Sequence, residues 1–200
     1  MIVLPKDHTD PLVVGVGHHR ACYIHPQDHS KCIKVVHNPC EHATQEIQRE
    51  LAYYRHLAGY LKDWRGLPKY YGEVETNLGK GYVYDRIVDF DGKPSETMQQ
   101  RYTAQSLPSL SSEMEKLIAD LKQYLWDNHI VTMSIKPYNI LCHRISENEI
   151  FPVVCDNIGS AAFIPIEVYC PWFCHKKHQR LFKKFDKYMQ DYLSTLRTGA

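Results

Sequence analysis

Five polar residues that are far apart in the sequence have types and spacings suited to phosphate chemistry. Lys34 lies in the apolar stretch CIKVV, and Glu50 flanks the apolar face of a predicted helix that follows it. A carboxylate half buried on such a helix needs a cation, and Lys34 is available to supply it. This pair would hold the lysine ammonium at the α- and β-phosphates of a nucleotide.

The other three residues lie in the stretches SIKPYNIL and CDNIG. Asn139 is expected to start one strand of a hairpin and Asp156 to end the other, so an amide oxygen and a carboxylate would lie side by side. These are hard oxygen ligands suited to magnesium, and Lys136 would reach the terminal phosphate. Because Asn and Asp are also common turn residues, purely local capping is the alternative.

Two glycines, Gly15 and Gly17, are expected between the first two strands. Taken alone, such a pair is more often a tight hairpin than a phosphate loop. The lack of a following helix argues against a dinucleotide-binding fold or a Walker loop. A glycine-turned hairpin lying over phosphates is instead the arrangement of protein kinases.

Hydrophobic periodicity predicts the elements that must position these residues. Strands are expected over 12–36 and 73–90, and a short hairpin over 139–156. Three amphipathic helices are expected. The first covers residues 43–61, and its apolar face is formed by Ile47, Leu51, Tyr54, Ala58 and Leu61. The second begins with a capping box of Ser112 and Glu115, and the third covers residues 171–196, with Leu181, Phe185, Tyr188 and Tyr192 on one face. The polar, turn-rich segment 91–109 is the best candidate for a hinge.

On these residues and motifs the chain resembles the protein-kinase-like superfamily and, more closely, the bacterial YrbL family, named as part of the PhoP regulatory network. The similarity runs over most of the chain and fades in the last 40 or so residues. It is carried by GVGHHRACY, ELAYYRHL, KDWRGLPKYYG, GYVYDRIVDFDGKPS, IVTMSIKPYNILCHRISE and PVVCDNIG.

The resemblance implies an α+β, bilobal protein-kinase-like fold. Residues 1–89 would form an antiparallel-sheet N-lobe with one regulatory helix, and residues 90–200 a hinge and a reduced, mainly helical C-lobe. The cofactors implied are ATP and magnesium. By the same resemblance Gly15 and Gly17 match the first two glycines of the Gly-rich loop, Lys34 the strand lysine, Glu50 its helix partner, Asn139 the metal-holding Asn of the catalytic loop, and Asp156 the Asp of D-F-G.

Several positions depart from the kinase pattern. Arg20 replaces the third loop glycine, and it would either crowd the phosphates or add a cation to them. Ser134 stands where the catalytic-loop Asp is expected, and no A-P-E sequence follows. A serine hydroxyl cannot accept a proton at neutral pH as a carboxylate does. The chain is therefore interpreted either as a slow or atypical phosphotransferase or as a pseudokinase, a nucleotide-responsive binding module.

Composition constrains the partners and the compartment. Lys plus Arg total 24 against 23 for Asp plus Glu, which does not indicate nucleic acid as a partner. Seven scattered cysteines favour free thiols, and no apolar run approaches the length of a membrane span, so we expect a cytoplasmic protein. The expected partners are a nucleotide and an unidentified protein or small-molecule acceptor.

Two groups of residues near the C-terminus, one of Cys and His and one of basic residues, each allow two interpretations. Cys170, Cys174 and His178 recur every four residues, but zinc sites usually gather ligands from two elements, and ordinary thiols are the preferred interpretation. The run HKKHQRLFKKF is interpreted as a solvated basic helix face in preference to a membrane-binding one.

Overall fold

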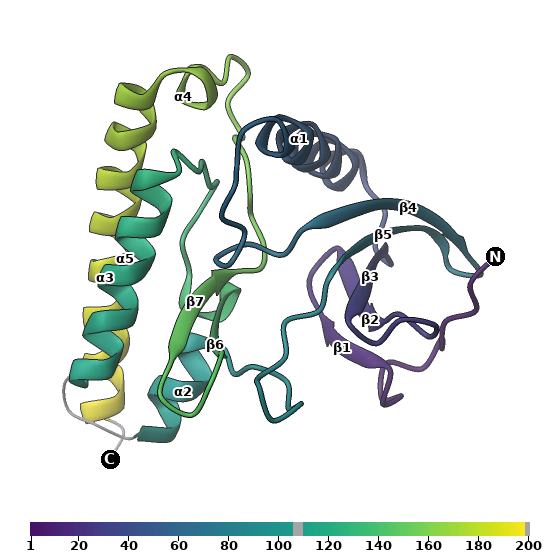
Figure 1. Cartoon of the computed structure of the whole chain (residues 1–200), viewed down its shortest axis with the longest axis horizontal. Coiled ribbons are helices and arrows are strands. Elements are labelled where there is room, and N and C mark those ends of the chain that lie inside the picture. The colour runs from purple at the N-terminus through teal and green to yellow at the C-terminus, as the bar shows by residue number, and fades with distance from the viewer. Residues whose placement is uncertain (106–109, 199–200) are drawn as a thin grey trace. The chain divides into compact units, whose positions relative to one another are not determined.

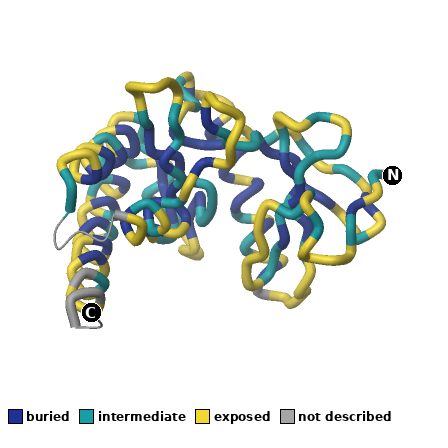
Figure 2. Tube along the Cα trace, turned by 90° about the horizontal axis from the view of Figure 1, so that it is seen from below, coloured by how far each residue is buried: buried dark blue, intermediate teal, exposed yellow. Residues whose placement is uncertain are grey.

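The computed structural model describes residues 1–105 and 110–198, which form two compact units. The first unit contains residues Met1–Gln48 and Pro68–Ile87, and the second contains Arg49–Leu67 and Val88–Ala200. In each unit the buried residues follow the strands and the inner faces of the helices (Figure 2). No described helix is long and apolar enough to cross a membrane.

The first unit is built on a five-stranded antiparallel sheet with the order β1-β2-β3-β5-β4 (Figure 1). Its strands are β1 (Val13–Val16), β2 (Arg20–Ile24), β3 (Lys31–Val36), β4 (Tyr70–Thr76) and β5 (Gly79–Asp85). Alternate residues of β2, β3 and β5 face one apolar core, made by Leu4, Ala21, Tyr23, Ile33, Val35 and Val83. The strands predicted over 12–36 and 73–90 are present, but the second pair begins at Tyr70 and ends at Asp85, before the predicted end at residue 90.

Helix α1 (Glu41–Ala58) begins in the first unit and continues into the second. Its predicted face is largely correct, because Ile47, Leu51 and Tyr54 are buried. Ala58, however, is exposed, whereas Leu57 is completely buried. The helix ends at Ala58, directly before Gly59 and three residues before the predicted end, but Leu61 is buried as predicted.

The second unit packs helices against a two-stranded hairpin. The helices are α2 (Met98–Gln105), α3 (Ser112–Asp127), α4 (Ile166–Tyr169), α5 (Pro171–Thr198) and the 3-10 turn η1 (Pro137–Asn139); the strands are β6 (Ile140–Arg144) and β7 (Ile150–Val154). Helix α3 contacts both α5 and β7 (Figure 1). It buries the predicted residues Met114, Leu117, Ile118, Leu121 and Leu125.

Two details of these helices differ from the sequence predictions. The N-cap of α3 is Ser111 and not Ser112: the Ser111 hydroxyl accepts a hydrogen bond from Met114 N–H, which moves the capping position by one residue. On α5 the buried face is formed by Cys174, His178, Phe182, Phe185 and Met189. Tyr188, predicted to lie on the apolar face with Phe185, is instead 40% exposed.

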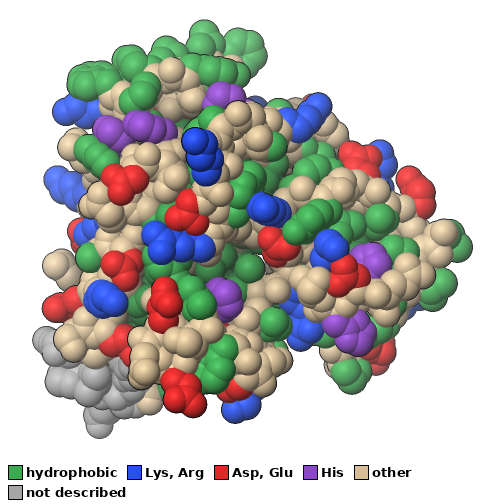
Figure 3. Space-filling view, viewed as in Figure 1, with side chains coloured by type: hydrophobic (Ala, Val, Ile, Leu, Met, Phe, Trp, Pro, Cys, Tyr) green, Lys and Arg blue, Asp and Glu red, His purple; other side chains and the backbone are tan. Residues whose placement is uncertain are grey.

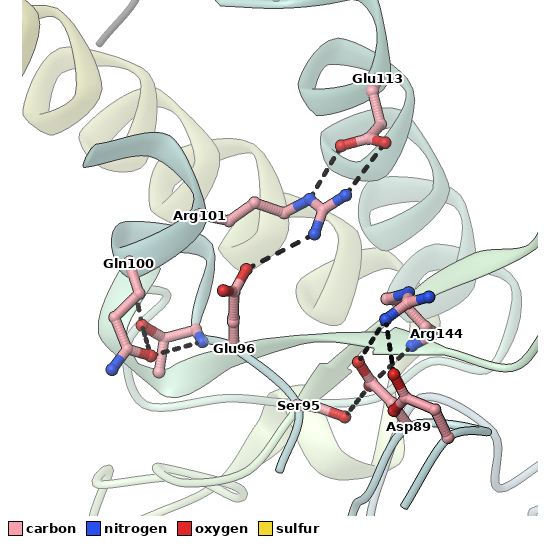
Figure 4. A network of polar contacts seen from close by, with 9 residues as sticks. Asp89, Ser95, Glu96, Gln100, Arg101, Glu113 and Arg144 are labelled. Carbon is pink, nitrogen blue, oxygen red and sulfur yellow. Dashed lines mark hydrogen bonds and ion pairs between the residues drawn. The ribbon is translucent and has the colours of Figure 1, made fainter. Parts of the chain in front are cut away.

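The segment predicted as a hinge, 91–109, contains helix α2, with Met98 and Tyr102 fully buried; residues 106–109 lie outside the described part of the chain. A polar network fastens this segment to its neighbours (Figure 4). Arg101 makes two hydrogen bonds to Glu113 of α3, at 2.8 and 3.1 Å.

The same network continues around a buried carboxylate (Figure 4). Asp89 accepts hydrogen bonds from the Ser95 hydroxyl and from Arg144 N–H. The described part of this segment is anchored within the second unit, because Arg101 pairs with Glu113 of α3 and Asp91 pairs with Arg144 of β6.

Candidate functional site

In the first unit, Lys34 lies in the middle of β3, on the sheet face opposite the apolar core. Its neighbours Ile33 and Val35 point into that core, so the lysine points the other way. Lys34 pairs with Cys22 of β2 and with Tyr82 of β5. Its ammonium nitrogen lies 4.9 Å from the ring centroid of Tyr84, which is a cation–π distance.

The two glycines near Lys34 occupy different positions. Gly17 lies in the β1–β2 turn, where its N–H donates a hydrogen bond of 2.8 Å to the carbonyl of Arg20. Gly15, expected between strands, lies inside β1 and pairs with Cys22. A Cβ atom at Gly15 would meet no atom within 4 Å, whereas one at Gly17 would lie 3.3 Å from the Arg20 carbonyl oxygen.

In the second unit, the predicted hairpin is present and brings Asn139 and Asp156 to the same end. Strands β6 and β7 pair with Ile140 opposite Val154, so Asn139 immediately precedes the first pair and Asp156 follows two residues after it. The carbonyl of Asn139 accepts a 3.0 Å hydrogen bond from Cys155 N–H. Their amide and carboxylate oxygens are hard donors of the kind that magnesium prefers.

The loop before β6 carries Ser134 and Lys136, and contacts with residues 155–158 hold both of its ends. Met133 N–H donates a 2.7 Å hydrogen bond to the carbonyl of Asn157, and Thr132 forms an antiparallel bridge with Ile158. At its other end the loop is held by the bond between Cys155 and Asn139. We call residues 133–139 together with 154–159 the clamped loop.

Within the clamped loop, Ser134 is half buried and Lys136 is exposed. The Lys136 ammonium nitrogen lies 5.4 Å from the ring centroid of Tyr138. Backbone hydrogen bonding at both ends thus confines Ser134, Lys136, Asn139 and Asp156 to one short stretch of structure.

The second half of α1 contacts the residues beside the clamped loop. Tyr53, which is buried, accepts a 2.7 Å hydrogen bond from Val131 N–H. Gly159 packs beside it, because a Cβ at Gly159 would lie 3.2 Å from the Tyr53 Cβ. Glu50 lies one helical turn before Tyr53 and is only 3% exposed, which confirms that it lies on the buried side of the helix.

The pattern analysis missed the residues that hold the clamped loop. Tyr53 is not among the residues predicted to form the site, and the pairing of Met133 with Asn157 has no periodic signal. Positive φ angles at Asn157 (61°) and Gly159 (107°) turn the chain after Asp156. The local signal for this turn was the sequence Asn157-Ile158-Gly159, because Asn and Gly tolerate positive φ best.

The C-terminal Cys and His residues do not form a metal site in the described chain. Groups of three or more His, Cys, Asp or Glu side chains placed to hold an ion are absent from the described residues. The ring nitrogen Nε2 of His178 donates a 2.7 Å hydrogen bond to the carbonyl of Ile130. Burial lowers the pKa of His178 and raises the pKa of the Cys174 thiol to about 11, so both are neutral at pH 7.

The architecture places the chain among proteins with a protein-kinase-like fold. The solved structure described as "PpkA-294 apo form" aligns with 72% of the chain at a TM-score of 0.50 and 16% sequence identity. The chain spans 56% of the length of that structure. At this identity the similarity concerns the fold alone.

Sequence similarity then defines the family. Residues 7–190 match the family described as PhoP regulatory network protein YrbL, and the chain belongs to this family. It is 52% identical over 172 residues to the YrbL proteins of Escherichia coli (strain K12) and Shigella flexneri, covering 86% of this chain and 82% of each relative. The resemblance inferred from the motifs is confirmed, but the expectation that the similarity fades in the last 40 or so residues is wrong, because the family match extends to residue 190.

Proposed function

We propose that this protein binds ATP together with magnesium and acts as a slow or atypical phosphotransferase. The observation that carries the proposal is the clamped loop, in which backbone hydrogen bonds hold Ser134, Lys136, Asn139 and Asp156 in one place. Phosphoryl transfer depends mainly on positioning and on electrostatic stabilisation, and a rigid loop of this composition serves both.

The donor chemistry of the clamped loop suits magnesium. Asn139 and Asp156 would hold the ion through an amide and a carboxylate oxygen. A bound magnesium ion would neutralise charge on the phosphates. Lys136 is exposed and carries a flexible ammonium, which suits it to a terminal phosphate oxygen.

Lys34, like Gly15 and Gly17, is a residue of the first unit that the kinase resemblance associates with the nucleotide. Its ammonium lies on the sheet face opposite the core, over the ring of Tyr84. Glu50 is the buried carboxylate that the same resemblance pairs with this lysine. We therefore propose that both residues support nucleotide affinity.

The second candidate function is that of a pseudokinase, and Ser134 favours it. Its hydroxyl cannot serve as a general base at neutral pH. A positioned base contributes about 10²–10⁴-fold to rate, so its loss slows transfer greatly but does not exclude it. In this alternative the nucleotide-bound form is recognised by a partner protein and no phosphate moves.

Thermal unfolding with ligands tests nucleotide binding. A ligand at 100 times its Kd stabilises the native state by about 2.7 kcal/mol, which corresponds to a rise in Tm of about 5–10 °C for a chain of this size. We expect this rise for wild type with ATP and magnesium. We expect it to be much smaller for Lys34→Ala and Asp156→Ala, while Lys80→Ala, on an exposed position of the same sheet, should behave as wild type.

Failure of wild type to respond at millimolar ATP and magnesium would refute nucleotide binding. Transfer of labelled γ-phosphate then separates the two functions. The phosphotransferase proposal predicts slow turnover that Asp156→Ala abolishes and that Ser134→Asp accelerates, because a carboxylate base is restored. A thermal response without turnover would support the pseudokinase.

A further inference from the structure

Large apolar side chains are exposed together between the clamped loop and α5. Phe163 is 96% exposed, Tyr169 is 74% exposed and Ile164 is 68% exposed. Ile166, Trp172 and Phe173 add to this surface, which we call the aromatic patch. The hydrophobic side chains over α4 are gathered at the top of Figure 3. A contiguous exposed apolar surface of this kind marks an interaction site.

A row of cations continues from the aromatic patch along α5. Lys176, Arg180, Lys183 and Lys187 follow one another at helical spacing, on the face opposite the buried Cys174, His178 and Phe185. We call these four residues the basic stripe. The ammonium nitrogen of Lys176 lies 5.5 Å from the ring centroid of Trp172, so the stripe begins where the patch ends.

Acidic residues do not neutralise this surface. Between Ser160 and Lys187 the sequence has two acids, Glu167 and Asp186, against six cations: Lys176, Lys177, Arg180, Lys183, Lys184 and Lys187. Glu167 forms a 2.8 Å ion pair with Lys177 and accepts a hydrogen bond from the Ser160 hydroxyl, and Asp186 lies 3.5 Å from the ammonium nitrogen of Lys122. Neither Lys177 nor Lys122 belongs to the basic stripe. The surface therefore has an excess of positive charge beside exposed aromatic rings.

We propose that the aromatic patch and the basic stripe together dock on the surface of an anionic lipid bilayer. Aromatic and isoleucine side chains enter the headgroup region, where amphipathic rings are most stable, while the cations contact anionic headgroups. The stripe covers 12 residues, its two ends are about 16 Å apart along the helix, and it presents its charges to one plane. Sequence patterns alone favoured a solvated basic face; the exposed aromatic patch at its end was not foreseen.

A flat, fluid surface fits the patch better than a protein groove does. Phe163 and Tyr169 line one side of a hollow of about 270 Å³ beside α1. Phe163, Ile164 and Tyr169 nevertheless project into solvent over most of their surface, so most of the apolar area of the patch lies outside that hollow. Each Lys or Arg near an anionic membrane adds about fivefold to partitioning. This docking does not depend on nucleotide binding.

Vesicle flotation of the full chain tests the proposal. Vesicles of phosphatidylcholine with 30% phosphatidylglycerol are compared with vesicles of phosphatidylcholine alone, and we expect binding only to the anionic vesicles. The triple variant Arg180→Glu/Lys183→Glu/Lys187→Glu should bind about 100-fold more weakly. Its matched control, Lys6→Glu/Lys62→Glu/Lys116→Glu, changes the net charge equally at exposed positions elsewhere and should bind as wild type.

A second variant tests the aromatic patch independently of charge. Phe163→Ser/Ile164→Ser removes two exposed apolar side chains and should bind at least about tenfold more weakly. Circular dichroism should show unchanged folding, because both positions are exposed. Lipids brominated in the acyl chains should quench wild-type tryptophan fluorescence, and Trp172→Phe should remove most of that quenching.

The proposal is overturned if wild type does not float with anionic vesicles, or if the basic-stripe variant and its control bind alike. A third arm replaces the vesicles with a designed amphipathic peptide of Leu and Glu. Binding of this peptide without vesicle flotation would overturn the lipid proposal in favour of an acidic protein partner.

Discussion

The hydrogen bond between Tyr53 and Val131 gives a sharp test of how α1 is joined to the clamped loop. Tyr53→Phe removes only the hydroxyl group and keeps the ring, so it creates no substantial cavity. Val131 is completely buried, and its N–H donates to the Tyr53 oxygen at 2.7 Å. In the variant this N–H is left without its acceptor in an apolar environment.

The cost follows from the burial of that group. Leaving a buried donor unsatisfied costs about 1–3 kcal/mol, whereas an exposed hydrogen bond contributes much less. For a chain of this size, about 2–4 °C of Tm accompanies each kcal/mol. Tyr53→Phe should therefore lower the Tm by about 2–12 °C.

Intrinsic tryptophan fluorescence is the appropriate assay. Trp64, Trp126 and Trp172 are the three tryptophans of the chain, and all belong to the second unit, as do Tyr53 and Val131. Urea unfolding followed at these residues thus reports on the unit in which the bond is lost. The free energy of unfolding is obtained by linear extrapolation.

Tyr188→Phe is the matched control, because it also removes one phenol hydroxyl from the second unit. Tyr188 is 40% exposed on α5 and is not the acceptor for Val131. Its loss should cost less than about 0.5 kcal/mol. Equal effects of the two substitutions, or no effect of Tyr53→Phe, would refute the reasoning.

Three further predictions concern the second unit and its neighbours. Gly159→Ala should destabilise by about 1–3 kcal/mol in urea unfolding, because φ is 107° there, whereas Gly15→Ala, in open space, should change stability by less than about 0.5 kcal/mol. Burial lowers the pKa of His178, so below pH 6.5 the unfolded state binds more protons than the native state and stability falls toward pH 5. His178→Gln should flatten that fall between pH 7 and 5, and an unchanged slope would contradict the assignment. A double-mutant cycle of Arg101→Ala and Glu113→Ala should give a coupling of about 1 kcal/mol, because the two-bond contact is partly buried; purely additive effects would contradict it.

Local features of the site were predictable because they depend on neighbours in sequence. A hairpin needs only a short loop between two apolar runs, so the approach of Asn139 to Asp156 followed from pattern alone. The burial of Glu50 likewise followed from helical periodicity. The position of Lys34 on a strand was also predictable, because the alternation of side chains along CIKVV determines which of them share a face of the sheet.

Two predictions were wrong at positions where the sequence pattern does not distinguish between alternative residues. Ser111 and Ser112 are equally good caps by residue type, and the choice between them depends on where the helix backbone begins. Tyr188 was predicted to lie on the buried face because its side chain is partly apolar. In the structure it is 40% exposed, since amphipathic side chains such as tyrosine often keep their polar end in solvent.

The sequence by itself determined the family, the order of strands and helices, and which polar residues stand at the ends of which elements. The tertiary structure decided how the clamped loop is held, because the Tyr53–Val131 bond joins residues 78 positions apart. It also decided that the aromatic patch is exposed. An apolar residue is buried only when another part of the chain covers it, and that depends on packing between distant segments, which local periodicity does not encode.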